Sequence, residues 1–244
     1  MIAKKNSLDS RYLFQFNQCL VCGKPLLYKK DPALVICYHC GIQTKSQTVC
    51  SEGHFVCDEC SRRDVYSIIL DECILYKENN PIELAQRIFN NEKIRIHGPE
   101  HHLIVPAVML SVWCNHKKID DKTKKELLKE AQNRALRIQD GICASHGACG
   151  AAIGVGIFFS LILQVHELDK ENYGYINRAT ANTLMRIAKY GGPRCCKRSS
   201  YIAILQIRNQ LLEEFGIELP IPQKINCLYI HKNKECTLNE CLFF

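Results

Sequence analysis

The chain has 244 residues, of which 47% are hydrophobic and 23% are charged. This composition is typical of a globular chain and excludes a disordered or fibrous protein. The length fits one domain of about 150 to 200 residues with a small appendage. The formal net charge of +7 permits an anionic partner, but it is smaller than the basic footprint of a dedicated nucleic-acid-binding protein.

Cysteine sets this sequence apart, because 16 thiols accompany nine histidines. Residues 8–16 alternate apolar and polar side chains, so they do not form the apolar region of a secretory signal peptide. We therefore expect a cytoplasmic protein, whose reducing surroundings favour metal ligands or catalytic thiols over disulfides. The longest apolar run, residues 150–165, is shorter than the roughly 20 residues that span a bilayer, and it predicts a buried helix rather than a membrane segment.

In chain order, the first feature is a series of four ligand pairs between residues 19 and 60. Three pairs are C-x2-C turns, at 19–22, 37–40 and 57–60, and the fourth is Cys50-x3-His54. Each C-x2-C turn can place two thiolates at about 2.3 Å from one ion, and two such pairs complete a structural zinc site. We therefore expect a module with two zinc ions over residues 1–62.

The spacing of the pairs also indicates how they combine. Only two residues separate His54 from Cys57, which makes it difficult for the last two pairs to share one ion. A cross-braced arrangement is therefore favoured over a sequential, zinc-ribbon-like one. Its first site would comprise Cys19, Cys22, Cys50 and His54, and its second site would comprise Cys37, Cys40, Cys57 and Cys60.

The rest of the chain has the apolar spacing of helices. Residues 63–80 predict a connecting helix, which ends at an Asn-Asn-Pro sequence. Residues 81–244 predict an all-α domain, so that the expected fold is mainly α with a small zinc module in front. We expect a short strand around residues 227–230, and helices at 81–90, 99–113, 120–139, 150–166, 177–190 and 196–215.

Three motifs fall at predicted helix starts: HGPEHH at 97–102, CASHGACGAAIGVG at 143–156 and GGPRCCKR at 191–198. The first turn of a helix has free N–H groups and a partial positive charge, which favour a thiolate. Glycine beside such a thiol is expected where a cofactor or anion approaches the backbone. We therefore expect the motifs to converge on one pocket, with the candidate catalytic residues Cys149, Cys195, Cys196, His97, His101 and Glu100.

The same region contains candidate cofactor ligands and substrate-binding residues. If the tail folds back over the helix starts, its cysteines could join the others around a [4Fe–4S] cluster, because cluster ligands can lie far apart in sequence. Three cations, Arg194, Lys197 and Arg198, are expected to attract an anionic substrate. The candidate cluster ligands are Cys149, Cys195, Cys196, Cys227, Cys236 and Cys241.

Two other interpretations of these thiols stay open. In the first, the site uses thiols only: Cys149 or Cys195 attacks, Cys196 resolves, and a histidine transfers the proton. In the second, the tail cysteines form a further structural zinc site. By contrast, Cys73 and Cys114 lie in apolar helical surroundings and are expected to be core residues.

The three motifs, together with the tail pattern Asn233-x2-Cys236-x4-Cys241, resemble those of a cysteine-rich prokaryotic family of unknown function. The resemblance covers about residues 85–244, and the zinc module precedes this domain in some relatives. The family's domain occurs alone or joined to radical-SAM proteins, which implies a redox or radical-SAM partner protein. The resemblance implies no settled activity.

We therefore expect a metal-dependent redox or sulfur-transfer enzyme that uses a [4Fe–4S] cluster and two zinc ions. The alternative is a non-catalytic zinc-binding adaptor or a thiol-only redox protein. An RNA such as tRNA is an alternative partner to an anionic small molecule, because lysines of the zinc module and residues 117–125 add positive charge. Interleaved acids at 126 and 130 instead indicate that the latter segment is a solvated helix face.

Overall fold

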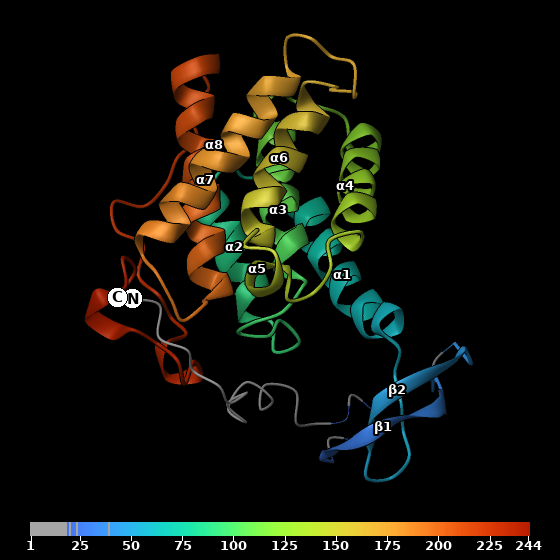
Figure 1. Ribbon diagram of the computed structural model, residues 1–244. Coiled ribbons are helices and arrows are strands. Elements are labelled where there is room, and N and C mark those ends of the chain that lie inside the picture. The colour runs from blue at the N-terminus through green and yellow to red at the C-terminus, as the bar shows by residue number, and fades with distance from the viewer. Residues whose placement is uncertain (1–18, 20, 23, 39) are drawn as a thin grey trace. The chain divides into compact units, whose positions relative to one another are not determined.

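The computed structural model describes residues 19, 21–22, 24–38 and 40–244, with the backbone alone at 61–64. Residues 8–16, on which the expectation about a signal peptide depends, lie outside this part. The chain divides into two compact units, Met1–Asp64 and Val65–Phe244 (Figure 1). The prediction of a mainly helical chain with two cysteine-rich groups near its start is confirmed.

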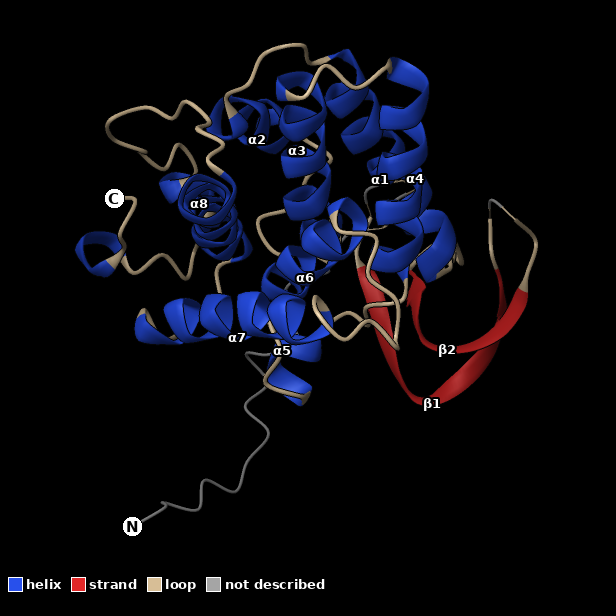
Figure 2. Cartoon of the chain, turned by 90° about the horizontal axis from the view of Figure 1, so that it is seen from above, coloured by secondary structure: helices blue, strands red, loops and turns tan. Residues whose placement is uncertain are grey.

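The first unit is built on a two-stranded antiparallel sheet, in which β1 (Leu26–Ile36) pairs with β2 (Gln43–Cys50) (Figure 2). The register shifts between Tyr28 and Ala33. Among the described side chains of this unit, the buried ones are Cys19, Cys37 and Cys50. The described residues of this unit therefore form no apolar core, as is typical of small domains that fold around metal ions.

The second unit is helical. Its first helix, α1, begins in the first unit at Asp58, earlier than the expected connecting helix, and ends at Leu75. The remaining α-helices are α2 (Pro81–Asn90), α3 (His101–His116), α4 (Asp121–Leu136), α5 (Ile142–Ser145), α6 (Gly150–Ile162), α7 (Tyr173–Lys189) and α8 (Cys196–Phe215). Two 3-10 helices, η2 (Ile230–Lys232) and η3 (Leu238–Glu240), follow in the tail.

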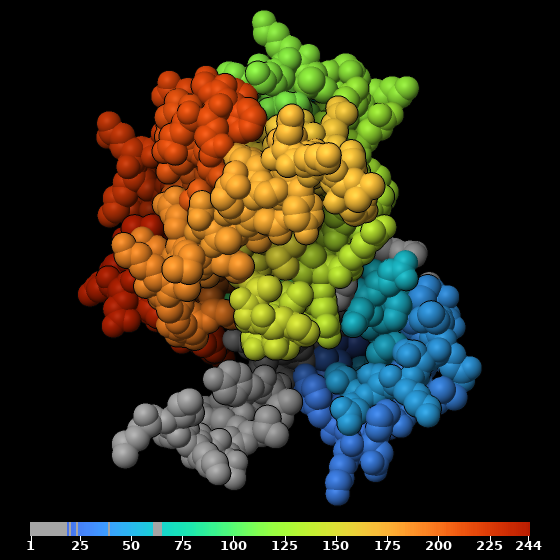
Figure 3. Space-filling model, turned by 45° about the horizontal axis from the view of Figure 1, so that its top comes forward, coloured from blue at the N-terminus to red at the C-terminus, as the bar shows by residue number. Residues whose placement is uncertain are grey.

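Helix α3 is the centre of this unit. Nearly all of its residues are buried, as expected of a helix that is apolar on every side. It packs against α2, α4, α6 and α8 (Figure 2). Helix α7 lies at the surface, where it forms much of the face shown in orange in Figure 3, and only Ala179 and Thr183 of it are buried. No helix of the described residues is long and apolar enough to cross a membrane.

The glycines of the 143–156 motif serve helix packing. A Cβ atom at Gly150 would meet the imidazole ring of His102, and one at Gly154 would meet Pro106 Cδ at 2.9 Å. Both neighbours belong to α3, so the absence of a side chain at these two positions of α6 lets the two helices lie close together. The HGPEHH and GACG motifs thus meet through packing, whereas the sequence indicated that the second glycine of GACG admits a cofactor or an anion.

The tail folds back without the predicted strand. Residues 216–244, all of them described, contain no strand, and the segment expected to form one at 227–230 leads instead into η2. The Cys227 N–H donates to the carbonyl of Phe243 at 2.7 Å, so the tail closes on itself rather than pairing with a second extended segment. Figure 1 shows this red segment beside the start of α8. Residues of the tail and of the start of α8 line one pocket.

Candidate metal and thiol sites

The first ligand group of the N-terminal unit joins the turn before β1 to the end of β2. The Sγ of Cys22 lies 3.5 Å from the Sγ of Cys50 and 3.3 Å from the Nδ1 of His54. Cys19 completes the group, and the four ligand atoms lie within 4.8 Å of one another. Burial acts to raise the pKa of Cys50, but the Glu52 N–H and the neighbouring thiols outweigh it and lower that pKa to about 6. This group is therefore suited to bind a cation as a thiolate site.

The second ligand group joins the turn between the strands to the start of α1. Its members are Cys37, Cys40, Cys57 and Cys60, whose sulfurs also lie within 4.8 Å of one another. The Sγ of Cys40 is 3.7 Å from that of Cys57, and the Cys57 N–H donates to the Sγ of Cys37 at 3.4 Å. A Zn–S bond of about 2.3 Å places the ligands of one ion within about 4.6 Å of each other. Both groups can therefore hold a metal ion such as zinc, and their membership is the cross-braced one expected from the spacing.

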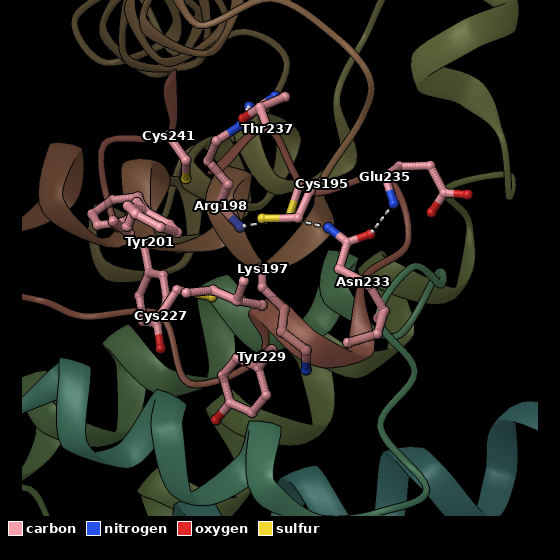
Figure 4. Close-up of a pocket in the computed structure, with 15 residues that line it drawn as sticks. Cys195, Lys197, Arg198, Tyr201, Cys227, Tyr229, Asn233, Glu235, Thr237 and Cys241 are labelled. Carbon is pink, nitrogen blue, oxygen red and sulfur yellow. Dashed lines mark hydrogen bonds between the residues drawn. The ribbon is translucent and has the colours of Figure 1, made fainter. Parts of the chain in front are cut away.

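The helical unit has a pocket at the start of α8, which the tail covers (Figure 4). Four thiols line it: Cys195 precedes α8, and Cys227, Cys236 and Cys241 come from the tail. Apolar groups such as Ile96, Tyr201 and Phe243 form much of the remaining wall. Within the described part of the chain, no three cysteine, histidine or acidic ligand atoms of this unit lie within 4.8 Å of one another. The four thiols thus share a cavity while they are spaced more widely than the ligands of one ion.

Cys195 occupies the N-cap position of α8, and two groups donate hydrogen bonds to its sulfur. The Arg198 N–H lies 3.5 Å from Sγ, and the Asn233 Nδ2 lies 3.8 Å from it. Burial raises the pKa of Cys195, and the N–H and guanidinium of Arg198 act in the opposite direction. Figure 4 shows both hydrogen bonds converging on the thiol. The half-buried thiol is therefore held by donors that favour its thiolate form.

The neighbouring Cys196 belongs to a different group of thiols. Its sulfur accepts a hydrogen bond from the Gly98 N–H and lies close enough to Cys149 and Arg194 for electrostatic interaction; burial, the largest effect, raises its pKa to about 12. Arg194 Nη1 in turn donates to the Sγ of Cys143 at 3.7 Å. Neither Cys149 nor Cys196 lines the pocket of Cys195. The vicinal cysteines thus connect two adjacent thiol groups, where the sequence indicated one.

Two of the expected catalytic groups are buried side chains. Glu100 is buried, and its carboxylate accepts from the Arg95 backbone N–H at 2.9 Å and from the Arg95 side chain at 2.6 and 3.1 Å. His101 is 1% exposed and stacks on Phe89 at 5.6 Å between ring centroids, and burial holds its pKa well below its ordinary value. Neither residue lines the four-thiol pocket.

His97 lies at the edge of this region. Its Nε2 is 3.3 Å from the Oδ1 of Asn233, and burial lowers its pKa, with Arg194 acting in the same direction. Asn233 therefore connects His97 to Cys195. The sequence assigned no role to Asn233 itself, although it is the first residue of the tail pattern that carried the family resemblance.

The three cations expected to bind substrate lie in different surroundings. Arg198 is buried, and its guanidinium donates to the carbonyls of Gly191 at 2.7 Å and Pro193 at 3.0 Å, so it holds the loop before α8. Lys197 is also buried, and burial lowers its pKa to about 8, against the effect of Glu100 and nearby thiols. Arg194 is the exposed member of the three.

A family model described as a family of unknown function, DUF5714, matches residues 69–244. The match begins inside α1 and therefore leaves the four ligand pairs of the first unit outside it. It confirms the resemblance to a family of unknown function and starts earlier than the expected residue 85. No curated protein and no solved structure matches the chain.

Proposed function

This chain belongs to DUF5714, a family of unknown function, and we propose that it is an iron–sulfur enzyme of redox or sulfur-transfer type. In this proposal, a [4Fe–4S] cluster is held in the helical unit by Cys195, Cys227, Cys236 and Cys241. The observation that carries the proposal is that these four thiols, from two separate parts of the sequence, line one pocket. Four cysteine thiolates are the usual ligand set of such a cluster.

The spacing of the thiols favours a cluster over a third zinc ion. In the N-terminal unit, both ligand groups are as compact as a single ion requires, whereas the thiols of the helical pocket are farther apart. A cluster attaches each thiolate to a different iron atom, so its ligands are more widely spaced than those of one ion. The N–H groups directed at Cys195 add further support, because hydrogen bonds to sulfur tune the potential of iron–sulfur clusters.

The second thiol group is the proposed substrate side. Arg194 is exposed and would attract an anionic substrate. Cys196 lies near both Arg194 and Cys149, and these two cysteines are the thiols proposed to carry sulfur or to be oxidised. When bound, the cluster supplies or accepts single electrons, and a redox partner protein would exchange them. The peptide bond between Cys195 and Cys196 joins the two groups directly.

The N-terminal unit has a separate role in this proposal. Two zinc ions occupy its four-ligand groups and take the place of an apolar core. They are structural rather than catalytic, because a closed tetrahedral site leaves no position for substrate. Removal of these ions would unfold the module and leave the chemistry of the helical unit to be measured independently.

Anaerobic purification followed by iron, sulfide and zinc analysis tests the proposal. We expect about four iron atoms and about four sulfides per chain, together with about two zinc ions. Cys227→Ser removes a proposed ligand and should lower the iron and sulfide content. Cys143→Ser changes a half-exposed thiol outside the pocket and serves as its matched control.

Three other results would contradict the cluster. About three zinc ions without sulfide would identify the pocket as another structural site. About two zinc ions without iron would leave a thiol-only enzyme or an adaptor. Equal loss of iron in both cysteine variants would show that the pocket is not where iron binds.

A further inference from the structure

The four-thiol pocket contains a buried cation that no hydrogen bond satisfies. Lys197 is 2% exposed, and its Nζ has no hydrogen-bond partner within the described part of the chain. The ammonium lies over two aromatic rings, 4.3 Å from the centroid of Phe89 and 4.4 Å from that of Tyr229. Two rings offset only part of the cost of taking an ammonium out of water. A buried charge of this kind needs a counter-charge nearby.

The surrounding groups indicate where that counter-charge lies. Glu100 is close enough to act on Lys197, but its carboxylate is engaged by three donors of Arg95. The other groups whose ionised form would interact with Lys197 are cysteine thiols, and two of them, Cys195 and Cys227, line the same pocket as the lysine itself. The ammonium is therefore placed to balance negative charge that gathers inside the pocket.

We propose that Lys197 is the fixed positive charge that raises the reduction potential of the cluster in this pocket, an inference that rests on the proposed function. A cluster bound by four thiolates is an anion, and reduction adds a further negative charge. A nearby cation stabilises the reduced form more than the oxidised form, and the apolar interior screens this effect less than water would. Net charge around a cluster is one of the established determinants of its potential.

The position of the ammonium is fixed by its neighbours. Phe89 belongs to α2, and Tyr229 belongs to the tail, where its hydroxyl donates to the Oδ1 of Asn90 at 2.8 Å. Figure 4 shows the Lys197 side chain running from the level of Cys195 toward the Tyr229 ring. The other buried cation of the pocket, Arg198, is committed to backbone carbonyls. Lys197 is thus the cation whose charge is not already used to hold a loop.

The test is the midpoint potential of the cluster in the full-length protein, followed by visible absorption and electron paramagnetic resonance during anaerobic titration. Lys197→Met keeps the length of the side chain and removes its charge, so we expect a shift to a more negative potential. Lys197→Arg keeps the positive charge, so its midpoint potential should lie close to that of the unmodified protein. Lys122→Met removes an exposed lysine of α4 that does not line the pocket, and it should leave the potential unchanged.

The outcomes separate this inference from the proposed function. Lack of iron and sulfide in the unmodified protein overturns the proposed function and the inference with it. A loaded cluster whose potential is unchanged in Lys197→Met overturns the inference alone. If Lys197→Met and Lys197→Gln retain their zinc and helix content but lose the cluster, retention of the cluster by Lys197→Arg supports the counter-charge. Loss from Lys197→Arg as well would show that shape matters rather than charge, which overturns the inference.

Discussion

Substitution of Gly150 by alanine tests whether the glycine-rich motif is a packing feature. An added Cβ would lie 2.6 Å from the Cγ of His102 and closer still to two other ring atoms, whereas non-bonded carbon atoms pack at about 3.5–4.0 Å. His102 is buried, so its ring has little room to move. Overpacking of this kind costs about 1–3 kcal/mol, and the helix preference of alanine recovers at most about 1 kcal/mol. We expect Gly150→Ala to lower the free energy of unfolding by about 1–2 kcal/mol.

Chemical denaturation followed by circular dichroism measures this change. Gly174→Ala, in α7, is the matched control, because a Cβ at this position would meet only the flexible end of Arg178 at 3.4 Å. This change should be neutral or slightly stabilising. Adding His102→Ala to Gly150→Ala removes the obstructing ring, so the effects of the two changes should be non-additive. If Gly150→Ala is as stable as Gly174→Ala, the close approach of α6 to α3 is not what the glycine provides.

Three further predictions concern the metal module, the loop before α8 and the buried histidine. Chelation of zinc should unfold β1 and β2 while the α2–α8 helices persist, because the described buried side chains of the first unit are thiols; protected hairpin amides after chelation would contradict this. Arg198→Met leaves two carbonyls without their donor and should cost about 2–4 kcal/mol of stability. Arg194→Met, at an exposed site, should change stability by less than about 0.5 kcal/mol. Equal losses in a denaturant titration would show that Arg198 does not hold the loop before α8. The folded-state pKa of His101 lies below its ordinary value of 6.5 because of burial, so the unfolded chain binds a proton first and stability falls as the pH drops below about 6.5. His101→Phe should reduce the dependence of the free energy of unfolding on pH between about pH 5 and 7. An unchanged dependence would show that other groups cause it.

The local features of this protein could be predicted from its sequence. The ligand pairs of the first unit follow from short spacings, so the two four-ligand groups agree with the structure. The bounds of α2 and α8 also agree, since a proline begins the first and Gly216, with a φ of 64°, ends the second. Local chemistry was sufficient in these cases because each signal lies within a few residues of the feature it determines.

The arrangement of the helical pocket depends on contacts between distant segments, which the sequence did not reveal. Which way Cys195 and Cys196 face is decided by the rotation of α8 and by the tail that covers only one of them. The pairing of Glu100 with Arg95 gives the carboxylate of the motif HGPEHH a partner that the sequence did not indicate. Phe89 and Tyr229 meet Lys197 from opposite parts of the sequence, so no spacing rule could have linked them.

The location of iron in the folded protein is the decisive measurement for the proposed cluster. A crystal structure of the anaerobically purified chain, with anomalous scattering measured at the iron edge, would show where the metal binds. We expect iron in the pocket at the start of α8, bonded to Cys195, Cys227, Cys236 and Cys241. Iron bound instead beside Cys149 and Cys196, or a single zinc ion on the tail cysteines, would contradict it.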